Sequence, residues 1–242
     1  MRHLAVALVC AGCSSVLGIE ELEGPGDGGV PQDRPTDVIV GPQLRISGTA
    51  QQISGPVGGQ GIANAQIELV TQGSDSRPEI TSSGLDGTFT LLVDTRGMPV
   101  DGYLRMTDLS GNVVPSDTFF VEPLTRDTEV VLQGFDRPTL DMLGAVCGAA
   151  AAITDFPVYI VAAVDAAKQP VAGVTIKSTP NGVICIDNGN PQPGNITGPS
   201  GIGFVFGIPP GAAVMTVGAT SRSVVAEPAT TMFVPVLTSP EP

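Results

Sequence analysis

The sequence predicts an all-β protein in which two tandem seven-stranded antiparallel β-sandwiches are joined by a short connecting helix. From residue 43 onward, short runs rich in β-branched and aromatic residues are separated by Gly, Pro, Asp and Ser. That pattern is typical of antiparallel strands and their turns. The runs form two sets with a shared pattern, and one segment between the sets has helical periodicity.

The first set of runs predicts a sandwich over residues 43–136. Asp86-Gly87 forms a turn before TFTLLVD, where Phe89, Leu91 and Val93 alternate with less apolar neighbours and present one face to a core. The six runs are LRISGTAQQ, AQIELVTQ, TFTLLVD, GYLRMTD, TFFVE and TEVVLQGF.

The second set repeats this pattern over residues 137–242. Residues 62–68 align with 171–177, and Asp86-Gly87 aligns with Ser200-Gly201. Each copy has the size of a domain, so we expect each to fold by itself. Residues 202–206 are apolar on both faces, which leaves open whether Phe204 or Val205 points into the sandwich. The second set comprises FPVYIVAAVDA, GVTIKS, GVICID, GIGFVFGI, AAVMTVGAT, SRSVVAEP and TTMFVPVL.

The segment TLDMLGAVCGAAAA, residues 139–152, predicts the connecting helix. Thr139 is a suitable N-cap, and Leu140, Leu143 and Cys147 fall on one face of a helix. We expect that face to pack on a sandwich; a helix that binds a partner is the alternative.

Residues 1–12 predict an export signal. A short basic head precedes 16 uncharged residues, 4–19, which is too few to cross a bilayer core of about 30 Å. Ala11 and Gly12 are small residues directly before Cys13. The CAGC stretch resembles the bacterial lipoprotein signal, which implies cleavage before Cys13, acylation of that cysteine and a lipid bilayer as partner. Ordinary secretory cleavage nearby is the alternative.

Residues 13–42 predict a disordered tether. Between residues 20 and 42 there are six acidic residues, one Arg and nine Gly or Pro, a composition that cannot bury enough apolar surface to fold. Gly24, Gly26 and Gly29 formally match GxGxxG, but no strand precedes them and no helix can follow, so no dinucleotide site is expected. The chain is then held in the cell envelope by its lipid, in an outer membrane and facing the periplasm or the surface.

Composition excludes several function classes. A net charge of −13 with scattered Lys and Arg argues against nucleic acid as a partner. His3 is the only histidine and leaves with the leader, so the usual general base and zinc ligand are missing. No GxSxG, Walker A, HExxH or EF-hand pattern occurs. We therefore expect no enzyme and no cofactor; a carboxylate-type enzyme would need two converging acids that no motif indicates.

Cysteine usage predicts a disulfide between Cys147 and Cys185. Cys10 leaves with the leader and Cys13 is acylated, so an exported chain carries this one even pair into an oxidising compartment. Two alternatives remain open: zinc binding, for which two cysteines supply too few ligands, and a buried reduced pair.

The loop DNGNPQPGN, residues 187–195, contains the weak candidates for a metal site. Asp187, Asn188, Asn190 and Asn195 carry oxygens suited to calcium or to sugar hydroxyls. Turn formation explains the same residues without a ligand, and we favour it because the regular carboxylate spacing of calcium loops is missing.

Three stretches of the second copy carry a family resemblance. PVAGVTI, TGPSGIGFVF and GIPPGAAVMTV are similar to the carboxypeptidase regulatory-like domain, a seven-stranded transthyretin-like, Ig-like sandwich common in bacterial surface proteins. The first copy resembles it through GIANAQIELV and SSGLDGTFTL, with VDTRGMPVDGYLRM in place of the Pro-Pro-Gly turn. Together the matches span most of residues 43–237.

The resemblance implies a fold and no chemistry, because such modules serve as spacers, stabilising appendages or binding units. We therefore expect a non-enzymatic structural, spacer or binding module of the cell envelope. Another envelope protein or a glycan would be a second partner. The alternative is a carbohydrate- or calcium-binding lipoprotein that uses the loops connecting its strands.

Overall fold

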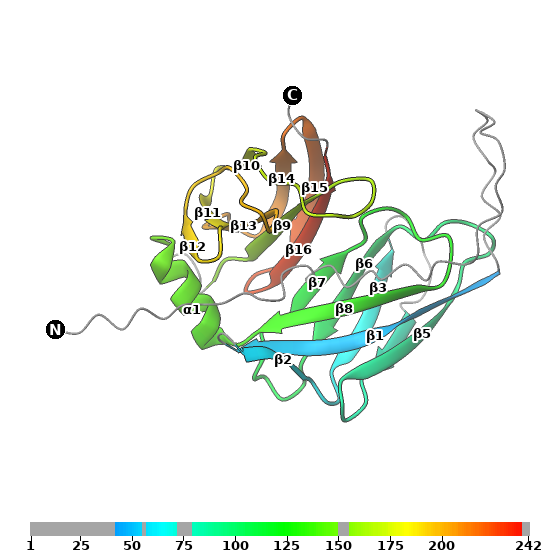
Figure 1. Ribbon diagram of the computed structural model, residues 1–242. Coiled ribbons are helices and arrows are strands. Elements are labelled where there is room, and N and C mark those ends of the chain that lie inside the picture. The colour runs from blue at the N-terminus through cyan, green and yellow to red at the C-terminus, as the bar shows by residue number, and fades with distance from the viewer. Residues whose placement is uncertain (1–41, 55–56, 72–78, 150–154, 239–242) are drawn as a thin grey trace, which may run out of the picture.

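The computed structural model describes residues 42–54, 57–71, 79–149 and 155–238. The predicted leader 1–12, the predicted lipidation site Cys13 and the predicted tether as far as residue 41 lie outside these residues. Within them the all-β prediction is confirmed, with eight strands in each half in place of seven (Figure 1). The first half contains β1 (Gln43–Ser54), β2 (Val57–Gly61), β3 (Gln66–Thr71), β4 (Glu79–Ser82), β5 (Thr88–Asp94), β6 (Gly102–Thr107), β7 (Ser116–Phe119) and β8 (Thr128–Phe135). The second half contains α1 (Arg137–Val146), β9 (Val158–Val164), β10 (Ile176–Thr179), β11 (Val183–Asp187), β12 (Pro191–Pro193), β13 (Ile202–Phe206), β14 (Gly211–Val217), β15 (Thr220–Ala226) and β16 (Thr231–Leu237).

The two halves share one strand order. In the first half, β1 lies between β5 and β8 in one layer, and β3, β6 and β7 are neighbours in the other. In the second half, β9 lies between β13 and β16, and β10, β14 and β15 are neighbours in the facing layer. The predicted repeat is therefore present in the topology.

Purely antiparallel pairing was a wrong prediction. The first and last strands of each half run parallel, β1 with β8 and β9 with β16. Alternation of apolar residues shows which face of a strand is buried but carries no information on strand direction, so parallel neighbours cannot be read from it.

One nine-stranded sheet runs through both halves. Its order is β12-β11-β13-β9-β16-β7-β6-β3-β4, and β16 joins the halves by pairing with β7 in parallel. Leu104 and Met106 of β6 point into the first core, and Asp117 of β7 lies on the opposite face of the sheet. Met232 of β16 is the register partner of Asp117, shares its face and points into the second core. The two covering sheets thus lie on opposite faces of the shared sheet.

Helix α1 begins two residues before the predicted cap. The Asp136 carboxylate accepts a hydrogen bond of 2.8 Å from the Thr139 N–H, so Asp136 is the N-cap and Pro138 lies in the first turn. Leu140 and Leu143 are buried as predicted and pack in a cluster with Phe204 and Phe206 of β13. The helix therefore covers the face of β13 that is turned away from the sandwich.

Within residues 202–206, Val205 and not Phe204 points into the sandwich. Val205 lies in the sandwich core between the two sheets of the second half, while Phe204 lies in the cluster beneath α1. Both faces of β13 are buried because each has its own cover.

The same turn, in which a glycine carbonyl accepts a hydrogen bond from the first strand of the sandwich, occurs at equivalent places in both halves; we call it the backbone corner. The Ala50 N–H donates to the Gly87 carbonyl at 2.8 Å, and the Ala163 N–H donates to the Gly201 carbonyl at 2.8 Å. Gly87 has φ of 84° and Gly201 has φ of 67°, in the left-handed region that favours glycine. An added Cβ would lie 2.5 Å from the Ala50 oxygen and 2.7 Å from the Ala163 oxygen, respectively.

A buried hydroxyl fastens the same corner in each half; we call it the hydroxyl clip. In the first half, Ser83 Oγ donates to the Ile62 carbonyl at 2.6 Å and accepts from the Ala65 N–H at 2.9 Å.

In the second half, Thr197 Oγ1 donates to the Val171 carbonyl at 2.9 Å and accepts from the Val174 N–H at 3.1 Å. Both clip residues are buried, so each satisfies two backbone groups that water cannot reach.

Candidate functional site

A group of polar contacts between distant parts of the chain lies where the two sandwiches meet, at the seam between β7 and β16. Three pairs of residues are in parallel register there: Ser116 with Thr231, Asp117 with Met232, and Thr118 with Phe233. The Thr231 N–H also donates to the Pro115 carbonyl at 2.8 Å. Backbone hydrogen bonds therefore connect the halves directly.

An arginine fork holds the first-half side of the seam. Arg105 on β6 and Asp117 on β7 are directly opposite each other in the antiparallel register. Arg105 Nε lies 2.9 Å from Asp117 Oδ1, and Arg105 Nη2 lies 3.1 Å from Asp117 Oδ2. The Asp117 side chain is fully buried. A bidentate pair of this kind fixes the orientation of both groups.

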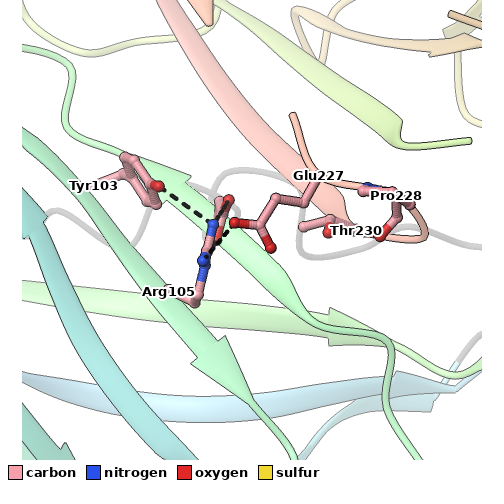
Figure 2. A network of polar contacts seen from close by, with 6 residues as sticks. Tyr103, Arg105, Glu227, Pro228 and Thr230 are labelled. Carbon is pink, nitrogen blue, oxygen red and sulfur yellow. Dashed lines mark hydrogen bonds and ion pairs between the residues drawn. The ribbon is translucent and has the colours of Figure 1, made fainter. Parts of the chain in front are cut away.

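The same guanidinium reaches across to the second half, as Figure 2 shows. Arg105 Nη1 lies 2.9 Å from Glu227 Oε1, on the segment between β15 and β16, and Arg105 Nη2 donates to the Tyr103 hydroxyl at 3.3 Å. Since the Glu227 side chain is 62% exposed, this ion pair contributes little to stability on its own. It adds a directional contact between the sandwiches.

Burial and pairing act in opposite directions on the Asp117 carboxyl. Burial raises the pKa of Asp117 above its ordinary value, although hydrogen bonds from Arg105 act to lower it. The hydrogen bond with Asp117 raises the pKa of Arg105, which stays fully charged. The bidentate hydrogen bonds from Arg105 replace part of the hydration that the buried carboxylate loses and fix the relative orientation of β6 and β7.

A second contact crosses the seam nearby. The Arg222 guanidinium on β15 lies 5.2 Å from the ring centroid of Phe119, and its Nη1 donates to the Pro235 carbonyl at 2.9 Å. The Phe119 ring in turn lies 4.7 Å from the Tyr103 ring. Burial lowers the pKa of Arg222. A half-buried cation over an aromatic face gains more than an exposed one would.

The network around Arg105 has a structural role at the seam. Both carboxylate oxygens of Asp117 and three nitrogens of Arg105 are engaged within the network. Groups bonded in this way hold two β-sandwiches in one orientation, and the arrangement offers no poised acid and base for catalysis.

The predicted disulfide is confirmed. Cys147 is bonded to Cys185, with Cα atoms 5.6 Å apart, and both residues are buried. Cys147 caps the C-terminus of α1 and Cys185 lies in β11. The bond therefore fixes the helix to the nine-stranded sheet.

The loop after β11 is organised by turn hydrogen bonds. Asp187 is buried, and its Oδ1 accepts from the Gly189 N–H at 3.1 Å, while the Asn188 N–H donates to the Asn190 carbonyl at 3.4 Å. Residues 191–193, expected as loop, form the short strand β12. Within the described ranges, no group of three His, Cys, Asp or Glu side chains is arranged to hold a metal ion.

Sequence reasoning missed the seam. The alternation in GYLRMT places Arg105 on the face opposite Leu104 and Met106, which is a usable signal for an outward charge. Pairing with Asp117 and Glu227 depends on strand register and on the position of the second sandwich, and neither is encoded in a local pattern.

Comparisons with known proteins give no family. No family model matches the chain, and no curated protein matches it. Of the described residues, none belongs to a helix with the length and apolar character needed to span a membrane.

Several solved structures share a distant likeness. The Bacillus anthracis TIE protein is 9% identical, with a TM-score of 0.26, over 82% of this chain and 34% of that longer chain. The minor pilin GBS52 of Streptococcus agalactiae is 15% identical, with a TM-score of 0.25, over 82% of this chain and 98% of that one. A DUF3823 family protein from Parabacteroides merdae is 16% identical, with a TM-score of 0.27, over 78% of this chain and 94% of that one. Likenesses at this level carry no argument about function.

Proposed function

We propose that this protein is a lipid-anchored, non-enzymatic structural or spacer module of the cell envelope. The observation that carries the proposal is the seam, where a shared sheet and the Arg105 network join two sandwiches into one body. A spacer must transmit position, and a continuous sheet does so better than two domains on a flexible linker.

The N-terminal residues supply the anchor in this proposal. Cys13 follows a short apolar segment and precedes an acidic Gly/Pro-rich stretch, so an acylated cysteine would connect the sandwiches to a lipid bilayer through a tether. The resemblance to the carboxypeptidase regulatory-like domain supports a role as a spacer or binding unit. A second envelope protein or a glycan is then the partner that such a module would meet.

Rigidity of the spacer is tested by distance measurement between the sandwiches. Leu85 and Val225 are 88% and 68% exposed and lie in the first and second halves, so Leu85→Cys and Val225→Cys provide sites for spin labels. We expect pulsed electron resonance on the doubly labelled chain to give one narrow distance distribution. A broad or bimodal distribution would contradict a rigid spacer. Singly labelled chains control for labels between molecules.

Anchoring is tested by fractionation of cells that express the chain with and without Cys13→Ala. The proposal predicts that the unaltered chain stays with membranes, loses residues 1–12 and gains lipid mass, whereas the variant is released. Equal retention of both would contradict the lipid anchor. Calcium or glycan binding would instead raise the melting temperature when ligand is added, and would favour a binding function over a spacer.

A further inference from the structure

Three hydroxyl groups without hydrogen-bond partners gather at the seam. Ser116 Oγ and Thr118 Oγ1 on β7 and Thr231 Oγ1 on β16 are all buried atoms, and none finds a partner within the described part of the chain. Ser116 and Thr231 are fully buried as whole residues. We call these three residues the hydroxyl cluster.

The cluster occupies one face of two adjacent strands. Ser116 and Thr231 are direct partners in the parallel register, and Thr118 follows two residues along β7 on the same face. Asp117, between them in sequence, points to the opposite face and binds Arg105. Neighbouring strands lie about 4.8 Å apart, so the hydroxyls of Ser116 and Thr231 are neighbours across the seam.

The surroundings of the cluster are apolar. On the first-half side, Leu104 and Met106 of β6 are the register partners of Thr118 and Ser116 and belong to the first core. On the second-half side, Val158 of β9 is the register partner of Thr231 and packs in the cluster beneath α1. The hydroxyls therefore lie between two apolar clusters, where an unpaired polar group is costly.

We propose that the hydroxyl cluster binds an ordered water molecule within the seam. Each hydroxyl is both a donor and an acceptor, and a water molecule has two of each function, so one water can bond to Ser116 and Thr231 together. Two O–H···O bonds of about 2.8 Å span the distance between adjacent strands. Buried waters typically make about three bonds to groups that lack protein partners, and Thr118 supplies the third.

The proposal gives the seam a property that the sandwich cores do not have. The two halves are joined by backbone bonds, the Arg105–Glu227 ion pair, the contacts of Phe119 with the second half and a bound water, while each core is filled mainly by apolar side chains. The water is part of the connection between halves, because it bonds to β7 on one side and β16 on the other.

The test uses the full chain carrying Cys13→Ser, so that no lipid is attached, with Thr231→Val added. Valine keeps the shape of threonine and removes the hydroxyl. We expect oxygen-17 relaxation dispersion to count one fewer long-lived water, and the melting temperature to fall by about 2–4 °C. Thr231→Ser keeps a hydroxyl and should keep the water.

Two further variants make the result decisive. Tyr159→Phe removes another buried hydroxyl without a partner, one that points into the second core, and it should leave the water count unchanged. An unchanged water count in Thr231→Val would overturn the proposal, because it would mean that the Thr231 hydroxyl binds no long-lived water. Ser116→Ala decides the matter in the same way if Thr231→Val does not fold.

Discussion

Strands β5 and β13 occupy the same place in the two sandwiches, yet they differ in how many faces they bury. In β5 the alternation is complete, and Leu92 is 56% exposed. In β13 every residue is buried, and Phe206, which is equivalent to Leu92 in the repeat, is fully covered. One topology therefore supports both a half-exposed and a fully buried sheet.

The difference comes from what lies outside the sandwich. Helix α1 and the Cys147–Cys185 bond cover the outer face of β13, whereas no element covers the outer face of β5 among the described residues. A repeat thus fixes strand order, and a short added element decides how apolar a strand must be.

Truncating the two equivalent residues gives the largest expected contrast. Phe206→Ala should lower the free energy of unfolding by about 3–5 kcal/mol, because it opens a cavity beneath α1. Leu92→Ala should change it by less than about 0.5 kcal/mol. Urea unfolding midpoints at constant m-value measure both changes. Equal losses of unfolding free energy in the two variants would contradict the difference in burial between β5 and β13.

Loss of the disulfide should affect the second sandwich first. Replacing Cys147 and Cys185 together by Ala is expected to cost about 2–4 kcal/mol, since the bond closes a loop with a sequence separation of 38. Hydrogen exchange should show faster opening of β11 and α1 than of β1 to β8.

A thiol count on denatured, unreduced protein is the companion measurement. The structure predicts no reactive thiol from Cys147 and Cys185. Two reactive thiols from this pair would contradict the bond. Cys13→Ala removes any signal from the remaining cysteine of an exported chain.

The hydroxyl clip should matter equally in both sandwiches. Ser83→Ala and Thr197→Val each leave buried backbone groups unpaired, at an expected cost of about 1–3 kcal/mol. Ser223→Ala, on the exposed face of β15, is the control and should be neutral. If only one of the two variants lowered the free energy of unfolding, the two corners would have the same geometry but would contribute unequally to stability.

Asp108, in the loop between β6 and β7, should give the first sandwich a pH-dependent stability. Burial acts to raise the pKa of Asp108, but hydrogen bonds from Ser110, Val113 and Asn112 outweigh it and lower the pKa below 3.8. The folded-state pKa is therefore below the unfolded one, and the stabilisation is complete above about pH 4. It is lost as pH falls through the lowered value.

Asp108→Asn should therefore cost about 1 kcal/mol at neutral pH, because an amide cannot accept all of these hydrogen bonds. The cost should vanish in strong acid. Unfolding curves at neutral and acidic pH measure the difference. The equivalent turn in the second half, between β14 and β15, has no carboxylate. A loss of stability in Asp108→Asn that persists in acid would contradict the account, because it would show a cause other than ionisation of Asp108.

Much of each sandwich can be read from local pattern. The strict alternation of β5, the Asp86-Gly87 turn and the apolar face of α1 follow from single segments, because burial of one face leaves a period in the sequence. The disulfide follows from counting the cysteines that an exported chain retains.

Other features depend on partners distant in sequence. Strands β2, β4 and β12 are short, and β12 is Pro-Gln-Pro, so none shows an apolar period. The helix start was misplaced because Asp136 follows directly on β8, where the sequence pattern is that of a strand end. The Arg105 network needs the register of β6, β7 and the segment before β16, which emerges only when both sandwiches are folded.

Separation of the two sandwiches tests most directly whether the shared sheet couples them. Fragment 43–136 contains the whole first core, and fragment 137–242 contains the second core except for Phe119. Both are expected to give β-type circular dichroism and cooperative melting. Each should melt below its midpoint in the whole chain, because the β7–β16 pairing and the Arg105 contact with Glu227 are lost. Midpoints unchanged by separation would contradict a seam that couples the two halves.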